Sequence, residues 1–224
     1  MESVWIEMDD GSAALCQEPR CRYVCGMPLP WSVQILAFDG MEVLDYAGPY
    51  EVFNVAGEVT DPSAFAVASV GVTPHPVGRG RFAIVPDFTL DDAPRADILV
   101  IPGGRGSRAL QRDERVLAWL RERSADASLL LTVCTGALVA GSAGLLAGLE
   151  ATTHHSAFDE LQAASPTTTV VRGRRFVRSS DRIRTSAGVS AGTDLALAVV
   201  AELAGAEAHA AVVDEMEWMW QDRA

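Results

Sequence analysis

Blocks of apolar residues recur along the chain between polar segments and predict a series of buried strands. Four such runs are 32–38 (SVQILAF), 65–70 (FAVASV), 98–101 (ILVI) and 128–133 (SLLLTV), and a shorter one is 82–85 (FAIV). Short runs in which apolar residues do not alternate with polar ones are typical of parallel strands that are covered on both faces. We therefore expect the centre of the protein to be a parallel sheet.

Segments with helical spacing lie between these runs. Pro49 suits the first turn of a helix whose apolar residues continue as far as Gly57, and a short amphipathic helix follows around 116–120. The Gly- and Ala-rich segment 136–149 predicts a helix that lies close against the sheet, and helices around 192–204 and 207–220 close the chain. Strands that alternate with helices predict an α/β fold with helices on both faces of the sheet.

The region before the last two helices is richer in basic residues. Arg172 to Arg184 alternates with Phe176, Val177 and Ile183 in a strand-like pattern. We interpret this stretch as the solvated face of a hairpin, with short strands near 170–171, 176–177 and 183–185.

Composition limits the class of protein. The chain has 224 residues, 49% of them apolar, which suits one α/β domain. Its formal charge is 18 − 30 = −12, and this argues against a nucleic-acid partner, because such partners are held by clustered Lys and Arg. No apolar run reaches the ~18–20 residues of a membrane span. The acidic start does not resemble a secretory signal, so we expect a cytoplasmic protein without a membrane partner.

The first 30 residues differ from the rest. Cys16, Cys21 and Cys25 lie there without CxxC spacing and without a nearby His, so a zinc site is not favoured. We expect residues 1–30 to be a disordered extension carrying free thiols, one that could even precede the true start, and residues 31–224 to form the domain. No metal is expected.

Polar or glycine residues follow three of the expected strands. They are Asp45 after the first strand and its turn, Gly103-Gly104 after 98–101, and Cys134-Thr135 after 128–133. Ligands of open parallel sheets bind outside the carboxyl ends of the strands. We therefore expect these three places to converge on one site.

Cys134 is the strongest candidate for chemistry. A cysteine between a buried strand and a helix presents its sulfur to unpaired N–H groups, which favour the thiolate. We therefore expect its pKa to fall below the usual value of about 8.5. The alternative is a small buried core residue, which is what most free cysteines are.

The neighbouring candidates also have structural alternatives. Gly103 and Gly104 could aim an N–H at a reacting atom, or could simply form a tight turn. Asp45 could share a proton with the thiol, or could cap a helix. His154 is a possible pocket residue, but it and His155 could equally cap a loop.

Five ordered motifs resemble the DJ-1/PfpI superfamily, in the branch that holds isonitrile hydratase and the ligand-binding halves of AraC-type regulators. The motifs are LDYAGPYEVF (44–53), ILVIPGG (98–104), TVCTGALVAGSAGLLAG (132–148), ATTHH (151–155) and TSAGVSAGTDLAL (185–197). The resemblance runs from about Val33 to the last helix. Several motifs in the same order are far more specific than any one of them.

The resemblance implies a flavodoxin-like three-layer sandwich, a homodimer, and a nucleophile elbow. Carried over residue by residue, it places the nucleophile on Cys134, the acid/base carboxylate on Asp45 and an assisting hydroxyl on Thr135. Backbone N–H groups of Gly104 and Thr135 would then line an anion-stabilising pocket.

Departures from related branches exclude other activities. Glutamine amidotransferases of this fold need a downstream His-x-Glu, and no His in this chain is followed two residues later by Glu. PfpI-type proteases tend to have His directly after the cysteine, where this chain has Thr135. The two helix-turn-helix units of an AraC-type regulator would follow the final helix, and they are not found in this sequence.

We therefore expect a small-molecule enzyme that hydrates an isonitrile to an N-substituted formamide and needs no cofactor. A second hypothesis is a redox or small-molecule sensor that uses the same thiol without turnover. A third is a regulator-like domain that binds its ligand without chemistry.

Overall fold

The computed structural model describes residues 30–218 and four short backbone segments before them. Those segments pair as two antiparallel ladders, β1 (Trp5–Glu7) with β2 (Ala13–Leu15), and β3 (Tyr23–Val24) with β4 (Met27–Pro28). Most of the expected extension 1–30, including its three cysteines, lies outside the described residues, and that prediction stays open.

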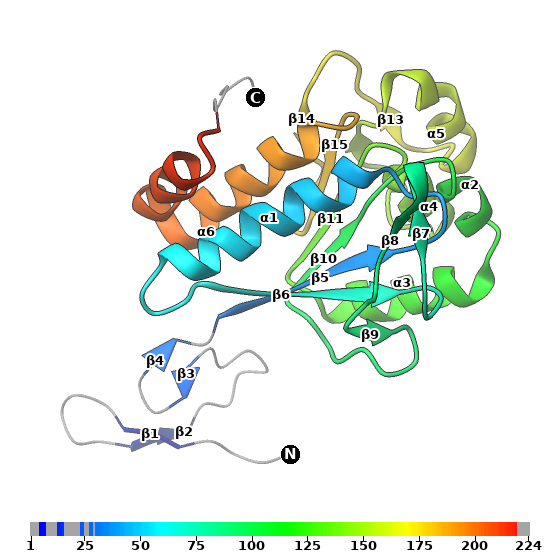
Figure 1. Cartoon of the computed structure of the whole chain (residues 1–224). Coiled ribbons are helices and arrows are strands. Elements are labelled where there is room, and N and C mark those ends of the chain that lie inside the picture. The colour runs from blue at the N-terminus through cyan, green and yellow to red at the C-terminus, as the bar shows by residue number, and fades with distance from the viewer. Residues whose placement is uncertain (1–4, 8–12, 16–22, 25–26, 29, 219–224) are drawn as a thin grey trace.

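The centre is a seven-stranded sheet with the order β14-β15-β11-β10-β5-β6-β9 (Figure 1). All neighbouring strands are parallel except β14, which is antiparallel to β15. The strands are β5 (Trp31–Ala37), β6 (Phe65–Gly71), β9 (Phe88–Thr89), β10 (Ile98–Ile101), β11 (Leu129–Val133), β14 (Phe176–Arg178) and β15 (Ile183–Ser186).

Helices cover both faces of the sheet and complete the three layers that the sequence predicted. Helices α1 and α6 pack on each other over one face, and α2 to α5 lie on the other (Figure 1). The helices are α1 (Val43–Val59), α2 (Ser107–Leu110), α3 (Glu114–Asp126), α4 (Gly136–Ser142), α5 (Phe158–Ala164) and α6 (Ala191–Glu215). Short pairs and turns complete the fold: β7 (Val77–Gly78) with β8 (Phe82–Ala83), β12 (Glu150–Ala151) with β13 (Thr169–Val170), η1 (Arg79–Arg81) and η2 (His155–Ala157).

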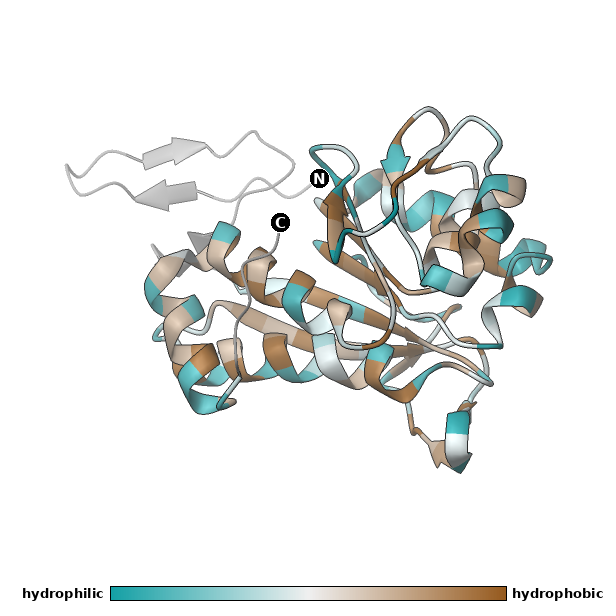
Figure 2. Ribbon diagram, turned by 90° about the horizontal axis from the view of Figure 1, so that it is seen from above, coloured by the Kyte–Doolittle hydropathy of each residue, from teal (hydrophilic) through white to brown (hydrophobic). Residues whose placement is uncertain are grey.

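The apolar runs of the sequence form the core. Every residue of β10 and β11 is buried, and Figure 2 shows these central strands as strongly hydrophobic ribbons between more polar helices. Each fully buried Leu or Ile side chain contributes about 1.5–3 kcal/mol to folding. This core fixes the carboxyl ends of the strands, on which the site is built.

Three elements differ from the sequence-based expectation. Helix α4 ends at Ser142 instead of continuing to 149. Strand β8 keeps only the first half of 82–85 and pairs with β7 outside the main sheet. The two expected final helices, by contrast, are confirmed: Gly205, with a φ of 90° and a ψ of 173°, is not helical and separates two helices within the run α6.

The third difference concerns the basic hairpin. Strands β14 and β15 do form it, but Arg184 is only 3% exposed. Its Nη2 donates to both carboxylate oxygens of Glu202, at 3.0 and 3.2 Å, so the charge is paired inside the fold. The expectation of a wholly solvated face is therefore wrong at this position, because a partner on α6 compensates the burial.

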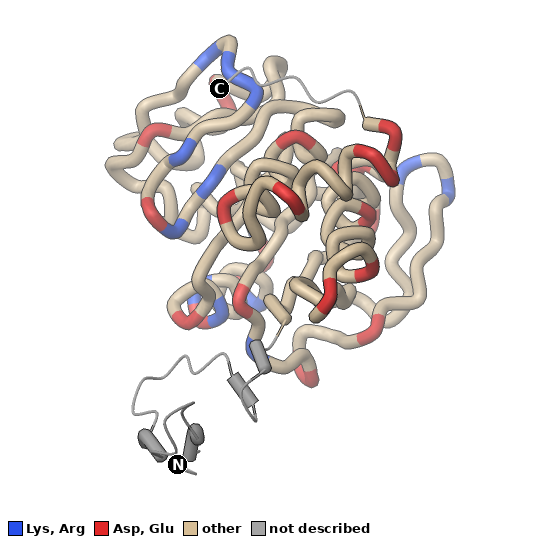
Figure 3. The backbone as a smooth tube through the Cα atoms, turned by 90° about the vertical axis from the view of Figure 1, so that its left-hand side faces the viewer, with Lys and Arg blue, Asp and Glu red and all other residues tan. Residues whose placement is uncertain are grey.

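Helix α6 also passes a membrane-span test by length and composition. It has 25 residues, and its most apolar 18-residue stretch has a mean hydropathy of 1.6. Yet it packs along α1 and contacts β11 and β15, as a core helix does. Figure 3 shows acidic residues spread along this two-helix layer, whereas the β7–β8 turn carries the basic Arg79 and Arg81.

Candidate active site

The three places singled out in the sequence converge at the carboxyl ends of the strands. Cys134 and Thr135 join β11 to α4, Gly103 and Gly104 follow β10, and Asp45 lies in the first turn of α1. Gly103 lies next to both Asp45 and Thr135, since its N–H donates to Asp45 Oδ2 and a Cβ on it would meet atoms of both residues. The expected convergence is therefore present.

Cys134 adopts a left-handed backbone conformation with φ of 55°. A non-glycine residue there costs on the order of 1–3 kcal/mol and persists only where its surroundings hold it. Its N–H donates to the carbonyls of Ser186 and Ala187 at 3.1 and 3.2 Å, and its own carbonyl accepts the Thr153 hydroxyl at 2.8 Å. This strained strand-to-helix turn has the geometry expected of a nucleophile elbow.

Asp45 is fully buried beside the elbow. Its Oδ2 accepts the Gly103 N–H at 3.1 Å. Its Oδ1 has no hydrogen bond of good geometry among the described residues. The Cys134 thiol and the Val189 N–H are nevertheless near enough to lower the pKa of this carboxyl. The carboxylate therefore faces the thiol and not a helix end.

Glycine is required at 103 and 104 by close approach. A Cβ on Gly103 would lie 2.4 Å from the Thr135 nitrogen and 2.9 Å from Asp45 Oδ2. Gly104 has φ of 119°, and a Cβ there would lie 2.3 Å from the Glu42 nitrogen. The two glycines let the β10 turn, the elbow and the start of α1 meet.

The Thr135 hydroxyl joins the elbow to the glycine turn. It accepts the Gly104 N–H at 2.9 Å and lies 3.1 Å from the Gly104 carbonyl and 3.0 Å from Ser107 Oγ. Sequence reasoning missed Ser107, whose hydroxyl also donates to the Gly104 carbonyl at 2.8 Å. In this conformation the Gly103 and Gly104 N–H groups are both engaged within the protein. Their oxyanion role therefore stays a prediction.

The pKa values of the central pair are both raised. Burial raises the pKa of Asp45 to about 7, against weaker lowering by hydrogen bonds from Cys134 and Gly103. Burial, and then the charge of Asp45, raises the pKa of the Cys134 thiol to about 12, although the Thr135 and Val189 N–H groups lower it.

The expected fall in the Cys134 pKa is therefore wrong. Sequence reasoning counted the N–H groups at the turn but not the loss of solvent or the neighbouring carboxylate. Helix α4 is also only seven residues long. The pair titrates jointly. When Asp45 holds the proton, its charge no longer opposes a thiolate, so proton transfer between the two groups is the route to a nucleophile.

Val189 is a site residue that the sequence did not indicate. It lies in the loop between β15 and α6 and has φ of 51°, a genuine outlier for a β-branched residue. Its N–H acts on both Asp45 and Cys134. The motif TSAGVSAGTDLAL contained it, but nothing in the residue type announces a role for a backbone N–H.

A small network holds this loop from behind. Buried Asp194 forms an ion pair with Arg175, whose Nη2 also donates to Ser190 Oγ at 3.2 Å. Trp218 Nε1 donates to the second oxygen of Asp194 at 3.1 Å. The loop that carries Val189 is thus anchored through Ser190 to Arg175, directly before β14, and Arg175 is in turn paired with Asp194 of α6.

His154 lies in the pocket wall as the N-cap of η2. Its Nδ1 accepts the Ser156 N–H at 3.2 Å and lies 2.8 Å from Ser156 Oγ, so the loop-capping alternative is realised. Burial, followed by His155 and Arg108, lowers its pKa, which favours a neutral ring. His154 also lines the pocket, as the sequence suggested, whereas His155 does not.

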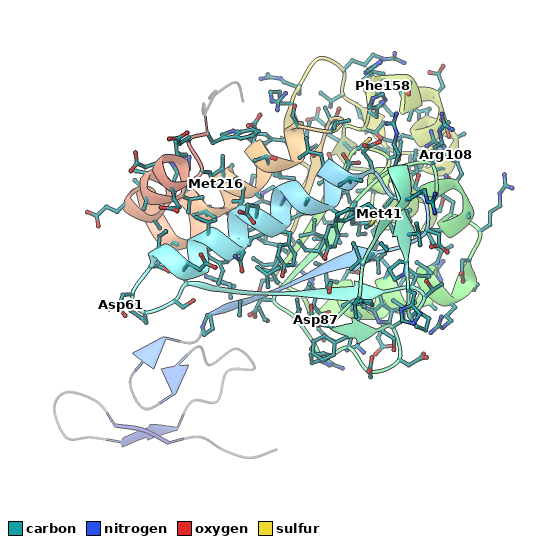
Figure 4. The ribbon with its side chains drawn as sticks, viewed as in Figure 1. Met41, Asp61, Asp87, Arg108, Phe158 and Met216 are labelled. Carbon is teal, nitrogen blue, oxygen red and sulfur yellow. The ribbon has the colours of Figure 1, made fainter. Side chains whose placement is uncertain are left out.

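An open pocket of about 380 Å³ leads to Cys134, a size that suits a small ligand. The sequence had indicated Gly104, Thr135 and His154 among its lining residues. The other lining residues were not foreseen and are mostly charged: Glu42, Arg79, Arg105, Arg108, Ser156 and Val189. Arg108 is close enough to Cys134 for their charges to interact, and it lies with Met41 on the side where the strands end (Figure 4). Among the described residues, no three His, Cys, Asp or Glu side chains are grouped as metal ligands would be.

Comparison with known proteins gives a consistent result. Residues 31–202 match the DJ-1/PfpI family. The chain is 33% identical to the isonitrile hydratase of Pseudomonas putida over 83% of this chain and 78% of that protein. It is 27% identical to the HTH-type transcriptional regulator GbdR of Pseudomonas aeruginosa over 82% of this chain, and it spans only 49% of that regulator.

Solved structures agree with the topology. A THiJ/PfpI family protein from Pseudomonas syringae superposes with a TM-score of 0.77 at 30% identity, covering 87% of this chain and 78% of that one. Drosophila melanogaster DJ-1beta superposes with a TM-score of 0.73 at 23% identity, covering 85% of this chain and all of its own. The second likeness concerns the fold alone.

Proposed function

Because this chain belongs to the DJ-1/PfpI family, we propose that it hydrates an isonitrile, R–N≡C, to an N-substituted formamide. The observation that carries the proposal is the position of the buried Asp45 carboxyl, which a hydrogen bond of 3.1 Å from the Gly103 N–H holds beside the Cys134 thiol. Burial raises its pKa to about 7, so both protonation states are accessible at neutral pH. A group with such a pKa can take up and return a proton within one cycle.

The first step forms a carbon–sulfur bond. Asp45 takes the thiol proton as the Cys134 sulfur attacks the terminal isonitrile carbon, and then delivers that proton to the same carbon, which gives a thioimidate, R–N=CH–S. The Val189 and Thr135 N–H groups support the sulfur while it carries negative charge. No net proton enters or leaves the pocket.

The second step consumes one water molecule. Asp45 takes a proton from the water as the water oxygen adds to the thioimidate carbon. Asp45 then gives this proton to the nitrogen. The tetrahedral adduct then collapses: the carbon–sulfur bond breaks, the hydroxyl proton of the adduct passes through Asp45 to the leaving thiolate, and R–NH–CHO is released. The balance is one isonitrile plus one water for one formamide.

Turnover of n-butyl isonitrile in H₂¹⁸O tests the proposal, with N-butylformamide measured by mass spectrometry. We expect one ¹⁸O in each product. We expect Cys134→Ala to lose at least a thousandfold in kcat/KM with an unchanged circular dichroism spectrum, and Cys25→Ala, outside the described residues, to retain activity. Turnover by Cys134→Ala would remove the assignment of the nucleophile.

A sensor is the second candidate, and the likeness to a transcriptional regulator favours it. Peroxide would then add oxygen to Cys134 selectively. The raised pKa of the thiol argues for slow oxidation, because the thiolate is the reactive form. Intact mass after mild peroxide, with no turnover of any isonitrile, would favour the sensor. A homodimer and a cytoplasmic location stay predictions.

A further inference from the structure

The mouth of the Cys134 pocket is cationic, although the chain as a whole carries a formal charge of −12. Three arginines line it, Arg79, Arg105 and Arg108, and Glu42 is the one acidic lining residue. Local reversal of charge at a pocket attracts ligands of the opposite sign. The ligand class is therefore to be sought among anions.

Two of these arginines have partners of their own. Arg79 Nη1 lies 2.8 Å from Glu42 Oε2. Arg108 donates to both oxygens of Glu160, at 2.7 and 2.9 Å, in the two-pronged geometry that fixes a guanidinium. Their positive charges are compensated, and their side chains are held as parts of the wall.

Arg105 is different. It directly follows the glycine turn and is exposed at the mouth. Within the part of the chain that the structure describes, its side chain has no hydrogen bond or ion pair to any residue. A guanidinium offers a planar fork of donors that matches a carboxylate. It can meet a substrate anion without first breaking a protein contact.

We propose that the substrate is an isonitrile that bears a carboxylate, and that Arg105 binds this carboxylate while Cys134 attacks the isonitrile carbon. This inference rests on the proposed hydration and names its substrate class. Arg105 is a specificity residue here, because it touches the substrate away from the reacting atoms. Its effect is to favour the charged substrate over a neutral analogue of the same size.

The test compares ω-isocyano carboxylates with their methyl esters. Isocyanoacetate, 3-isocyanopropanoate and 4-isocyanobutanoate differ in the distance between anion and reacting carbon. We expect kcat/KM for the best acid to exceed that of its ester at least tenfold, through KM. Arg105→Gln should abolish this preference and Arg105→Lys should keep part of it. Arg112→Gln, at an exposed arginine that does not line the pocket, should leave it unchanged.

Salt and product binding separate the possible failures. The preference should shrink in 0.5 M NaCl, because exposed charges are screened. Equal turnover of acid and ester would overturn the inference while hydration stands. If no isonitrile is turned over, calorimetric binding of N-formylglycine decides: binding at least tenfold weaker in Arg105→Gln keeps the anion site and rejects hydration, whereas equal binding rejects the anion site too.

Discussion

The Gly103 N–H donates a hydrogen bond to the Asp45 carboxylate at 3.1 Å, although the two residues are 58 positions apart in the chain. One residue further on, the Gly104 N–H donates to the Thr135 hydroxyl at 2.9 Å. The glycine turn thus fixes both the carboxyl and the elbow, and the distance between acid and thiol depends on it.

Gly103→Ala should disrupt the site more than the fold. The new Cβ would lie 2.4 Å from the Thr135 nitrogen, so the elbow must move. We expect a loss of about 1–3 kcal/mol in the free energy of unfolding and a loss of at least a hundredfold in kcat. Urea unfolding and turnover measure the two effects. Gly173→Ala is the control for activity only, because its Cβ meets nothing within 4 Å although its φ of 76° also strains an alanine; an equal loss of activity there would contradict this account.

Asp45→Asn should stabilise the protein at neutral pH. The pKa of Asp45 is about 7 in the folded protein, against an ordinary value of 3.8 for the unfolded chain. Between these two pH values, the folded state holds a proton that the unfolded state has released. Stability from this group therefore falls as pH rises from about 4 to 7 and then levels off. The variant should lack this slope and gain up to about 4 kcal/mol at pH 8. Urea unfolding of both proteins from pH 5 to 8 would reject the raised pKa if their difference stayed constant.

The same substitution should make Cys134 easier to ionise while it removes activity. The charge of Asp45 is the second cause that raises the thiol pKa to about 12, and Asn carries none. Thiolate absorbance near 240 nm, measured as a difference from Cys134→Ser in a background with Cys16, Cys21 and Cys25 replaced by Ser, follows the titration. A midpoint that did not move downwards in Asp45→Asn would show that the carboxylate does not act on the sulfur.

Val189→Gly should be tolerated unusually well. Val189 has φ of 51°, where a β-branched side chain is strained and glycine is not. We expect unfolding free energy to change by less than about 1 kcal/mol, with turnover retained because the N–H remains. Val171→Gly, at a valine without positive φ, should cost more. Loss of turnover in a folded Val189→Gly would give the valine side chain a role that its N–H does not explain.

The sheet and the meeting of three loops could be predicted because both follow from local pattern. Runs such as 98–101 match β10 residue for residue, and parallel strands bring their carboxyl ends to one edge. The electrostatics of the pair could not be predicted. The pKa of Cys134 depends on how deeply Asp45 and the sulfur are buried together, and this is set by residues 89 positions apart, one in α1 and one after β11.

The charged wall of the pocket also escaped the sequence. Arg105 and Arg108 lie in a polar stretch that has the composition of any surface turn, and only the return of the chain past Cys134 makes them lining residues. The same holds for Val189. Val189 contributes a backbone N–H, and its left-handed φ aims this N–H at the site. Valine is among the residues least expected in a left-handed backbone conformation.

The hydrogen bond from Trp218 to Asp194 gives the protein a built-in optical reporter. Asp194 pairs with Arg175, which holds Ser190, the neighbour of Val189. A rearrangement of the β15–α6 loop would therefore alter the polarity around the indole ring and shift its emission. The fluorescence difference between the wild-type protein and Trp218→Phe would thus report a rearrangement of this loop in real time, without a label.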